Sequence, residues 1–455
     1  MSGLVGIDFG TTNSVIALVL PGGGTRAATF GAMPQGSTQG STGGSAGGGA
    51  ATFRSVLCFS QPGGRGAVRH AAGPAAVEAY LDDPLDSRLL LSMKSYLAQS
   101  SFRETRVFGR PWTLEALIAL FLRELLAAAG LDPAQVHVTA GRPVQFAGDF
   151  PDDALGEARL RAAFAAAGFA SLGLAMEPEG AGHRFASTLD APATVLIGDF
   201  GGGTSDFSVL RFDPGGARRG AQGGAQGDAQ GDAQGGARRI APLGHAGIGI
   251  AGDSLDYRII DRVIAPRLGK GSTYTVMGGA PLPVPAEWYA GFARWHRLSL
   301  MRTPRTLRAI EEVARTASHP ERLRDLIALL EDEQGYPLYQ AVSAAKAALS
   351  SAESTVLRFR HGTLDIEQTI TRAEFEGWIA DELRRLDATV GQALAAAGLD
   401  ESGIDRVFLT GGTALVPAVR GLFERRFGAE RIAGGGEFLS VAEGLALIGA
   451  ERARG

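Results

Sequence analysis

The pattern of apolar and polar residues along the chain predicts a mixed α/β protein built around a repeated strand–turn–strand unit. Residues Val195 to Leu210 read as an apolar strand, a glycine-rich turn and a second apolar strand. Residues Leu4 to Leu20 repeat this plan near the N-terminus. Two copies of one unit suggest a duplicated fold, in which each half presents one hairpin to opposite sides of a shared ligand.

Elsewhere, apolar residues recur at helical spacing in several segments. A capping box of Thr371 and Glu374 starts one of these segments, and Gly335 is expected to stop another. Trp288 and Trp295 are spaced to share one buried face of a helix. The expected helices are Leu114–Leu126, Asp152–Ala167, Glu321–Glu333 and Thr371–Ala397, and strands are expected at Thr52–Phe59 and Val136–Thr139.

The two turns carry residues suited to a metal–phosphate ligand. In the later copy, Asp199 and Asp206 flank a run of glycine, threonine and serine. Glycine permits positive φ and a close approach of backbone to a ligand, and successive N–H groups in such a turn form a concavity for anions. Carboxylates on either side suit a divalent cation that also binds substrate phosphates. The earlier copy offers Asp8, Gly10, Thr11, Thr12 and Asn13.

Composition and charge exclude several other classes of protein. The 455 residues can bury more than one core, and 45% are hydrophobic and 20% charged. A formal net charge of −4 gives no electrostatic reason to expect nucleic acid or an anionic membrane as a partner. The single cysteine, Cys58, excludes an internal disulfide and a cysteine-cluster metal site, and we expect it to be a small apolar strand residue. No apolar run approaches the roughly 20 residues of a membrane span, so a cytoplasmic location is expected.

Two glycine-rich segments are expected to be flexible surface insertions, because neither can bury apolar surface. Residues 31–51 are rich in glycine, serine and threonine, and residues 214–239 contain a near-repeat of Gly, Ala and Gln. The second segment follows the Gly-rich hairpin directly. It is therefore interpreted as a lengthened turn between two strands.

The segments DFGTTNS, from Asp8, and DFGGGTSDFSV, from Asp199, resemble the two phosphate loops of the actin, sugar-kinase and heat-shock ATPase superfamily. Within it the chain most resembles DnaK-type heat-shock protein 70 chaperones, and GRPV at residues 141–144 is closer to their short YegD-like members. The resemblance implies an α/β, duplicated actin-like (ribonuclease H-like) two-lobed ATPase fold. It also implies the nucleotide-binding domain only, without a peptide-binding domain or lid.

The resemblance also implies domain boundaries. Residues 1–190 would form lobe I, with the loop 31–51. Residues 191–439 would form lobe II, with the loop 214–239 and an outer subdomain at about 253–340, and the C-terminal helix 440–455 would return to lobe I.

Site roles follow from the same resemblance. Lys94 would contact the γ-phosphate, the alternative being a surface lysine with a snorkelling side chain. Glu177, in the segment EPEGA, or Asp199 would orient the attacking water. Pro143 would either relay nucleotide state between lobes or simply end a strand. Mg²⁺ would be held by Asp8, Asp199 and Asp206, and phosphates by Gly10, Thr11, Thr12, Asn13, Gly201, Gly202, Gly203, Thr204 and Gly252.

The adenosine end both matches the family and departs from it. Lys346 and Ser350 fall on matching positions of an adenosine-gripping helix, as do Gly411, Gly412 and Thr413 in a third loop; Asp256 is expected at the start of a further helix. Ser343 replaces the acidic residue expected on the ribose, and Ala347 and Leu415 replace two arginines that would stack on adenine. Base stacking contributes about 1–3 kcal/mol elsewhere, so adenine affinity is expected to fall tenfold or more unless aliphatic contacts rebuild the clamp.

These observations leave several functions open. The first is an ATP-hydrolysing heat-shock-70-like chaperone, using ATP/ADP and Mg²⁺ and acting on an unknown client or partner protein. The second is a small-molecule kinase of the same superfamily, for which no general-base aspartate is assigned. The third is a weakly catalytic nucleotide-sensing interaction module, and filament formation is a minor fourth.

Overall fold

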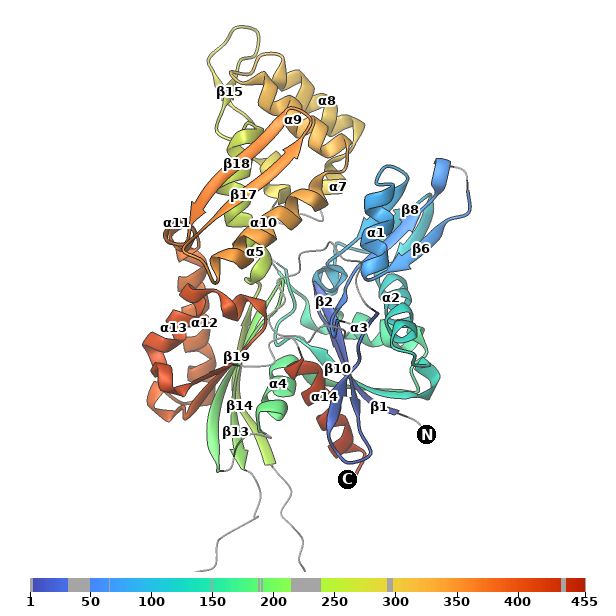
Figure 1. Cartoon of the computed structure of the whole chain (residues 1–455), viewed down its shortest axis with the longest axis vertical. Coiled ribbons are helices and arrows are strands. Elements are labelled where there is room, and N and C mark those ends of the chain that lie inside the picture. Colours follow the sequence, from blue (N-terminus) through green and yellow to red (C-terminus); the bar gives the residue numbers. More distant parts are fainter. Residues whose placement is uncertain are drawn as a thin grey trace, which may run out of the picture.

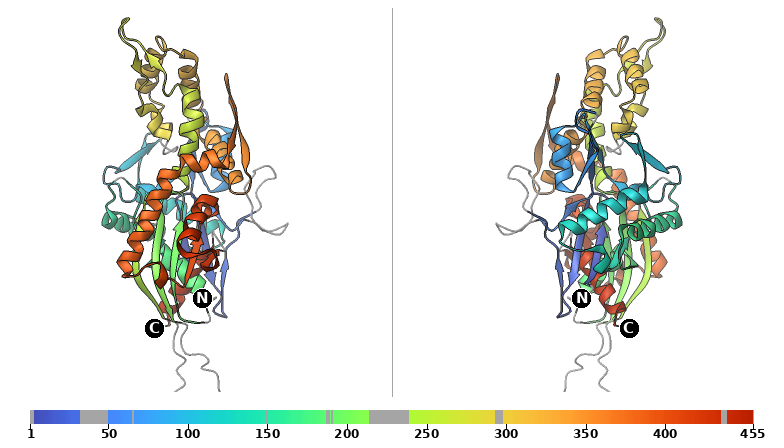
Figure 2. Two further views of the ribbon diagram at one scale, coloured as in Figure 1. Left: turned by 90° about the vertical axis from the view of Figure 1, so that its left-hand side faces the viewer. Right: turned by 90° about the vertical axis from the view of Figure 1, so that its right-hand side faces the viewer.

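A computed structural model describes residues 3–31, 50–64, 66–148, 150–186, 189, 191–213, 239–292, 298–434 and 439–454. Within these residues two mixed β-sheets stand side by side, and a smaller outer part projects from the same end of each (Figure 1). Figure 2 shows the outer parts from both sides. The chain is therefore a mixed α/β protein, as the sequence predicts.

The first sheet is built on the N-terminal hairpin. Its strand β1 pairs antiparallel with β2 and parallel with β10, and β10 continues parallel to β11. The apolar run of the hairpin supplies buried side chains such as Ile7, Phe9 and Ile16. The strands are β1 (Gly3–Phe9), β2 (Asn13–Val19), β3 (Thr25–Ala27), β4 (Phe53–Arg54), β10 (Val136–Arg142) and β11 (Ser171–Met176).

The second sheet has the same strand order and directions as the first. Strand β12 pairs antiparallel with β13 and parallel with β19, and β13 continues antiparallel to β14. Asp199 and Asp206 lie directly opposite each other across the hairpin. The strands are β12 (Ala193–Phe200), β13 (Ser205–Asp213), β14 (Arg239–Ile248), β19 (Arg406–Thr410) and β20 (Ile432–Gly434).

Helices α4 (Glu177–Ala186) and α14 (Ser440–Arg452) lie between the two sheets (Figure 1). Their backbones cross so closely that a Cβ on Gly444 would stand 1.6 Å from the carbonyl oxygen of Gly180. Helix α14 packs on β1, β2 and β10, whereas α4 packs on β12 and β13. The C-terminal helix therefore packs on the first sheet.

Other helices cover the outer faces of the sheets. Thr113 and Asp152 cap two of them with side-chain oxygens that accept backbone N–H groups. The apolar faces of these helices join separate cores beside each sheet. The helices are α2 (Leu114–Ala128), α3 (Asp153–Ala167), α12 (Ala380–Ala397) and α13 (Pro417–Phe427).

The outer part beside the first sheet holds Cys58, which is buried on β5 as expected. Its elements are β5 (Leu57–Ser60), β6 (Arg69–Ala72), α1 (Pro74–Asp82), β7 (Ser87–Leu90), β8 (Glu104–Val107) and β9 (Arg110–Thr113). The outer part beside the second sheet is more helical. Its elements are α5 (Gly252–Ile259), β15 (Thr273–Tyr274), β16 (Leu282–Pro283), α6 (Glu287–Ala290), α7 (Leu298–Met301), α8 (Pro304–Ala314), α9 (Pro320–Glu331), α10 (Gly335–Leu349), β17 (Ser354–His361), β18 (Leu364–Thr371) and α11 (Arg372–Trp378).

Several expected boundaries are wrong. The predicted strand Thr52–Phe59 is two short strands that pair with different sheets, so the chain turns between them. The predicted helix Thr371–Ala397 breaks at Ile379, although its capping box is present. Gly335 begins α10 instead of ending α9, and Asp256 lies inside α5 instead of at its start.

Some expectations fall on residues outside the description, namely Trp295 and most of the glycine-rich segments 31–51 and 214–239. Trp288 is buried on α6, as a core residue would be. The strands that flank the second segment pair at Asp213 and Arg239, which agrees with a lengthened turn. Among the residues that the structure describes, no helix is long and apolar enough to cross a membrane.

Candidate functional site

A cavity of about 600 Å³ opens between the two sheets and is lined by the turns of both hairpins. Most residues singled out from the sequence line it. The exceptions are Gly203, which lies against Thr11 and Ser95, and Asp206. The predicted residues that line the cavity are Asp8, Gly10, Thr11, Thr12, Asn13, Lys94, Glu177, Asp199, Gly201, Gly202, Thr204, Gly252, Lys346, Ser350, Gly411, Gly412 and Thr413.

Gly10 and Gly202 leave no room for a side chain in the two turns. A Cβ on Gly202 would lie 2.3 Å from Thr12 Oγ1 of the other hairpin, and a Cβ on Gly10 would lie 2.1 Å from the carbonyl oxygen of Asn13. Neither glycine has a positive φ, and Gly201 and Gly203 do not either. These glycines therefore do not use the left-handed region. They use the second property of glycine, its tolerance of close approach.

Lys94 and Glu177 form a buried ion pair on the cavity wall. Lys94 follows β7 and Glu177 begins α4, and Lys94 Nζ lies 2.5 Å from Glu177 Oε1. Burial by itself lowers the pKa of Lys94, but Glu177 and Asp8 outweigh it and raise the pKa above its usual value. Lys94 is thus a charged, buried lysine, and the alternative of a snorkelling surface lysine is wrong.

Asp8 and Asp199 end the first strands of the two hairpins and face the same cavity. Burial, reinforced by Glu177, raises the pKa of Asp8 to about 7. Burial and then Glu177 also raise the pKa of Asp199 well above its usual value. Burial therefore disfavours the ionised form of both carboxyl groups. A divalent cation bound between them would stabilise the ionised form and would accept their oxygens as ligands.

Asp206 is placed differently from the other two aspartates. Its Oδ1 accepts hydrogen bonds from the backbone N–H of Val144 at 2.9 Å and of Gln145 at 3.3 Å. Burial, followed by Glu177, raises its pKa to about 7. Asp206 therefore ties the second hairpin to the segment after Pro143 on the first sheet. Within the described residues, no group of three or more His, Cys, Asp or Glu side chains is arranged to hold a metal ion.

The third glycine loop and α10 close the far end of the cavity. Gly411 has a φ of +89°, and a Cβ there would lie 2.0 Å from the carbonyl oxygen of Phe200, so only glycine fits this turn. Lys346 Nζ lies 3.0 Å from Asp256 Oδ1 and donates to the carbonyl of Gly252 at 3.1 Å. The three departures from the family pattern also line the cavity: Ser343, Ala347 and Leu415.

Sequence reasoning missed Arg54, Asp253 and Tyr339, which also line the cavity. The N–H of Asp253 donates to the carbonyl of Gly202 at 2.9 Å, and Tyr339 donates to Asp253 Oδ1 at 3.4 Å. Burial raises the pKa of Asp253 to about 7. The sequence could have indicated two of the three. Asp253 follows Gly252, a predicted phosphate contact, and Tyr339 precedes Lys346 by two helical turns, which places both on one face of the helix. Arg54 reaches the cavity from a two-residue strand and carried none.

A comparison with known families relates part of the chain to one of them. The Hsp70 protein family model matches residues 327–451. The matched span includes α10, the third glycine loop and α14, and these elements supply the far end of the cavity and the helix that returns to the first sheet. The match supports a relationship to the Hsp70 family in this C-terminal part of the chain.

Proposed function

We propose that this chain is an Hsp70-like ATPase, which binds ATP with Mg²⁺ between its two sheets and hydrolyses it slowly. The observation that carries the proposal is the cavity lined by two equivalent hairpin turns, which come from sheets of the same strand order. The Hsp70 match over residues 327–451 supports the nucleotide as ligand. The short YegD-like subgroup remains part of this proposal.

The same observations support a more specific description of this mixed α/β fold, namely a duplicated, actin-like fold with two lobes. Lobe I would comprise residues 1–190, and lobe II would comprise residues 191–439 with its outer subdomain at about 253–340. The return of α14 to β1 and β2 supports assigning the last helix to lobe I. The cavity would then be the cleft between lobes, where domain movement and nucleotide state are coupled.

The residues present fit a magnesium nucleotide. The cavity of about 600 Å³ falls within the roughly 300–1,000 Å³ of ordinary ligand sites. Asp8 and Asp199 would hold the cation largely through waters, which is how Mg²⁺ is usually bound next to phosphates. Bound Mg²⁺ would supply charge neutralisation for the transferred phosphoryl group. Asp206, which is held by backbone N–H groups, would support this arrangement from behind the turn.

The protein's own groups would position the reaction. Backbone N–H groups and hydroxyls of Thr11, Thr12 and Thr204 would hold phosphate oxygens. Lys94, charged and buried, would stabilise negative charge on the γ-phosphate. Glu177 accepts a hydrogen bond from the same Lys94. It would also accept a hydrogen bond from the attacking water. These groups act through placement and charge, which is most of what phosphoryl transfer requires from a protein.

A weakly catalytic nucleotide-sensing module is the second candidate. Ala347 is exposed and Leu415 is 40% exposed at the end of the cavity where the family pattern places arginines. The base would therefore lack a planar cation on either side. Weak binding of nucleotide with little turnover, read out by an unidentified partner protein, would favour this candidate over a chaperone-type ATPase.

The test is calorimetric titration of MgATP and MgADP, followed by single-turnover hydrolysis, on the wild type and on Asp199→Asn. We expect nucleotide binding with slow release of free phosphate, and loss of hydrolysis in the variant. Asp365→Asn, on the exposed surface of β18, is the matched control and should behave as wild type. A phosphorylated small molecule would indicate a kinase instead. No binding at millimolar nucleotide would overturn the proposal.

A further inference from the structure

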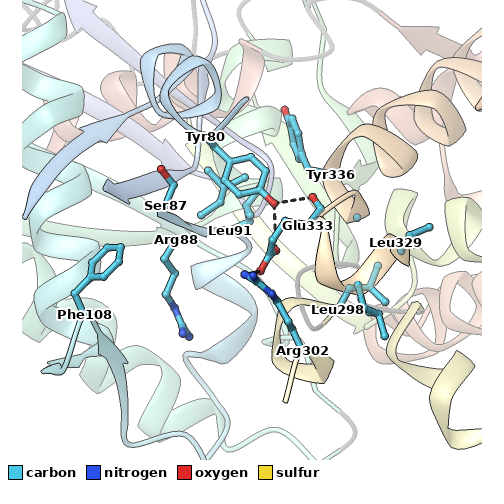
Figure 3. Close-up of a pocket in the computed structure, with 13 residues that line it drawn as sticks. Tyr80, Ser87, Arg88, Leu91, Phe108, Leu298, Arg302, Leu329, Glu333 and Tyr336 are labelled. Atoms are coloured by element: carbon cyan, nitrogen blue, oxygen red, sulfur yellow. Dashed lines mark hydrogen bonds and ion pairs between the residues drawn. The ribbon is translucent and has the colours of Figure 1, made fainter. Parts of the chain in front are cut away.

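A second cavity, of about 300 Å³, lies between the two outer parts of the molecule and shares no lining residue with the first. One wall comes from α1, β7 and the β8–β9 turn, and the other from α7, α9 and the first turn of α10 (Figure 3). The walls combine polar side chains with apolar ones, among them Leu91, Leu298 and Leu330. Arginine side chains enter the cavity from both walls.

One of these arginines is already neutralised and the other is not. Arg302 Nη1 lies 3.1 Å from Glu333 Oε1, and Tyr80 donates to Glu333 Oε2 at 3.2 Å and to its carbonyl at 2.9 Å (Figure 3). Across the cavity, Arg88 donates to the hydroxyl of Thr105 at 3.0 Å. Among the described residues, no carboxylate lies within ion-pair distance of Arg88.

Arg88 is therefore a half-buried cation with spare hydrogen-bond donors beside a cavity that leucines partly line. A guanidinium carries five N–H donors and binds a carboxylate through two of them at once. Burial lowers the pKa of Arg88, with Glu333 opposing, so its charge is partly removed from water. A partly desolvated cation gains more from an anionic partner than an exposed one does. The neighbouring leucines would cover an apolar chain.

We propose that this outer cavity binds a small organic carboxylate with an apolar chain, its carboxylate on Arg88 and its chain against the leucine wall. The volume suits a chain of several carbons. Phe108, which is 37% exposed at a turn with a positive φ of 46°, stands at the rim and would cover part of the chain.

The position of the cavity gives such a ligand a mechanical consequence. Each wall is joined to the first cavity by a short stretch of chain. Lys94 of the first cavity comes shortly after Leu91 in the sequence, and Tyr339 comes one helical turn after Tyr336 on α10. A ligand that contacts both walls would hold the outer parts together. If nucleotide release requires these parts to separate, the carboxylate and the nucleotide would each strengthen binding of the other by the same factor.

The probe is octanoate, titrated calorimetrically into the nucleotide-free protein, so that the result does not depend on the proposed ATPase function. We expect octanoate to bind at least tenfold more tightly than 1-octanol and octylammonium not to bind. Shortening the chain to hexanoate should weaken binding by about fourfold for each CH₂ removed. Equal binding of octylammonium and octanoate would overturn the proposal.

Arg88→Gln should weaken octanoate binding at least tenfold, and Arg88→Lys should retain more of it. Arg106→Gln is the matched control, because Arg106 is exposed on β8 and does not line the cavity. Unfolding midpoints establish that each variant is folded. If Arg88→Gln does not fold, the affinity of Arg88→Lys and the comparison of octanoate with 1-octanol test the role of Arg88 instead. Wild-type affinity in a folded Arg88→Gln variant would refute the site. An unchanged MgADP dissociation constant in saturating octanoate would refute the coupling.

Discussion

The contact between Gly202 and Thr12 gives the sharpest prediction about the nucleotide cavity. A Cβ on Gly202 would lie 2.3 Å from Thr12 Oγ1, whereas ordinary contacts lie at 3.4–4 Å. Gly202→Ala therefore forces a movement of about 1 Å between the two hairpin turns. Threonine is stiff at χ1, so rotation of the hydroxyl does not relieve the overlap without cost.

The magnitude follows from the usual penalty for overpacking. An extra carbon in a well-packed contact costs about 1–3 kcal/mol. If that cost falls on the closed arrangement of the two turns, MgADP affinity should drop about 5- to 150-fold. Gly203→Ala is the matched control, because the atoms nearest a Cβ there, Ser95 Oγ and Thr11 Oγ1, are 3.4 Å away. It should bind MgADP within about threefold of wild type.

Calorimetry on a double-mutant cycle isolates the contact. Thr12→Ala removes the hydroxyl that Gly202→Ala would strike, so adding Gly202→Ala to that background should cost little. Unfolding of the nucleotide-free proteins separates stability from binding. Wild-type affinity in Gly202→Ala would refute the reasoning, as would an equal loss in Gly203→Ala or an undiminished loss in the Thr12→Ala background.

Three further predictions concern stability and base recognition. Burial and then Arg452 lower the pKa of His183 to about 4 from an ordinary 6.5. The folded protein thus resists a proton that the unfolded chain accepts, and its stability falls as pH drops between these values. Between about pH 7 and about pH 4.5, wild type should lose about 2 kcal/mol more than His183→Gln in urea unfolding, and parallel profiles would contradict this. Lys94→Met leaves Glu177 buried without its cation and should lower the free energy of unfolding by about 3–5 kcal/mol. The double variant with Glu177→Gln should recover part of this loss, and equal stabilities of the single and double variants would argue against the pair. Ala347→Arg, at an exposed position, should tighten MgADP binding about tenfold by stacking on the base, whereas Ala347→Lys should not; identical effects would indicate charge instead.

Local patterns in the sequence predicted the hairpins, and the family resemblance supplied most of the other predicted residues that line the cavity. An apolar strand followed by aspartate and glycine places its polar groups at the strand end, whatever the rest of the fold does. Asp8 and Asp199 are therefore found where they were expected. Asp206 does not line the cavity, and its carboxylate accepts hydrogen bonds from the backbone of Val144 and Gln145, which are distant in sequence.

The errors in element boundaries have a similar cause. The apolar spacing from Phe375 to Leu386 continues through Ile379, so periodicity carries no sign of the break there. The break divides the segment into α11, which buries Phe375, and α12, which buries Leu386 and Val390. Thr52–Phe59 reads as one strand, but its two halves pair with different sheets, which local pattern does not encode.

The outer cavity was not predictable from the sequence. Tyr80 meets Glu333 across 253 positions of sequence, and neither residue belongs to a motif. Glu333 has a φ of 54°, an unusual conformation for a non-glycine residue, and it follows the end of α9. Only the folded arrangement brings Arg88 opposite this pair.

The central claim, that turns from both sheets hold one nucleotide, is tested most directly by amide hydrogen exchange with and without MgADP. The account predicts that residues 10–13, 201–204 and 411–413 gain protection together, with the same dependence on MgADP concentration. The outer cavity around residues 87–91 should change less. Protection confined to one turn, or absent from all three loops while MgADP is bound, would contradict the account.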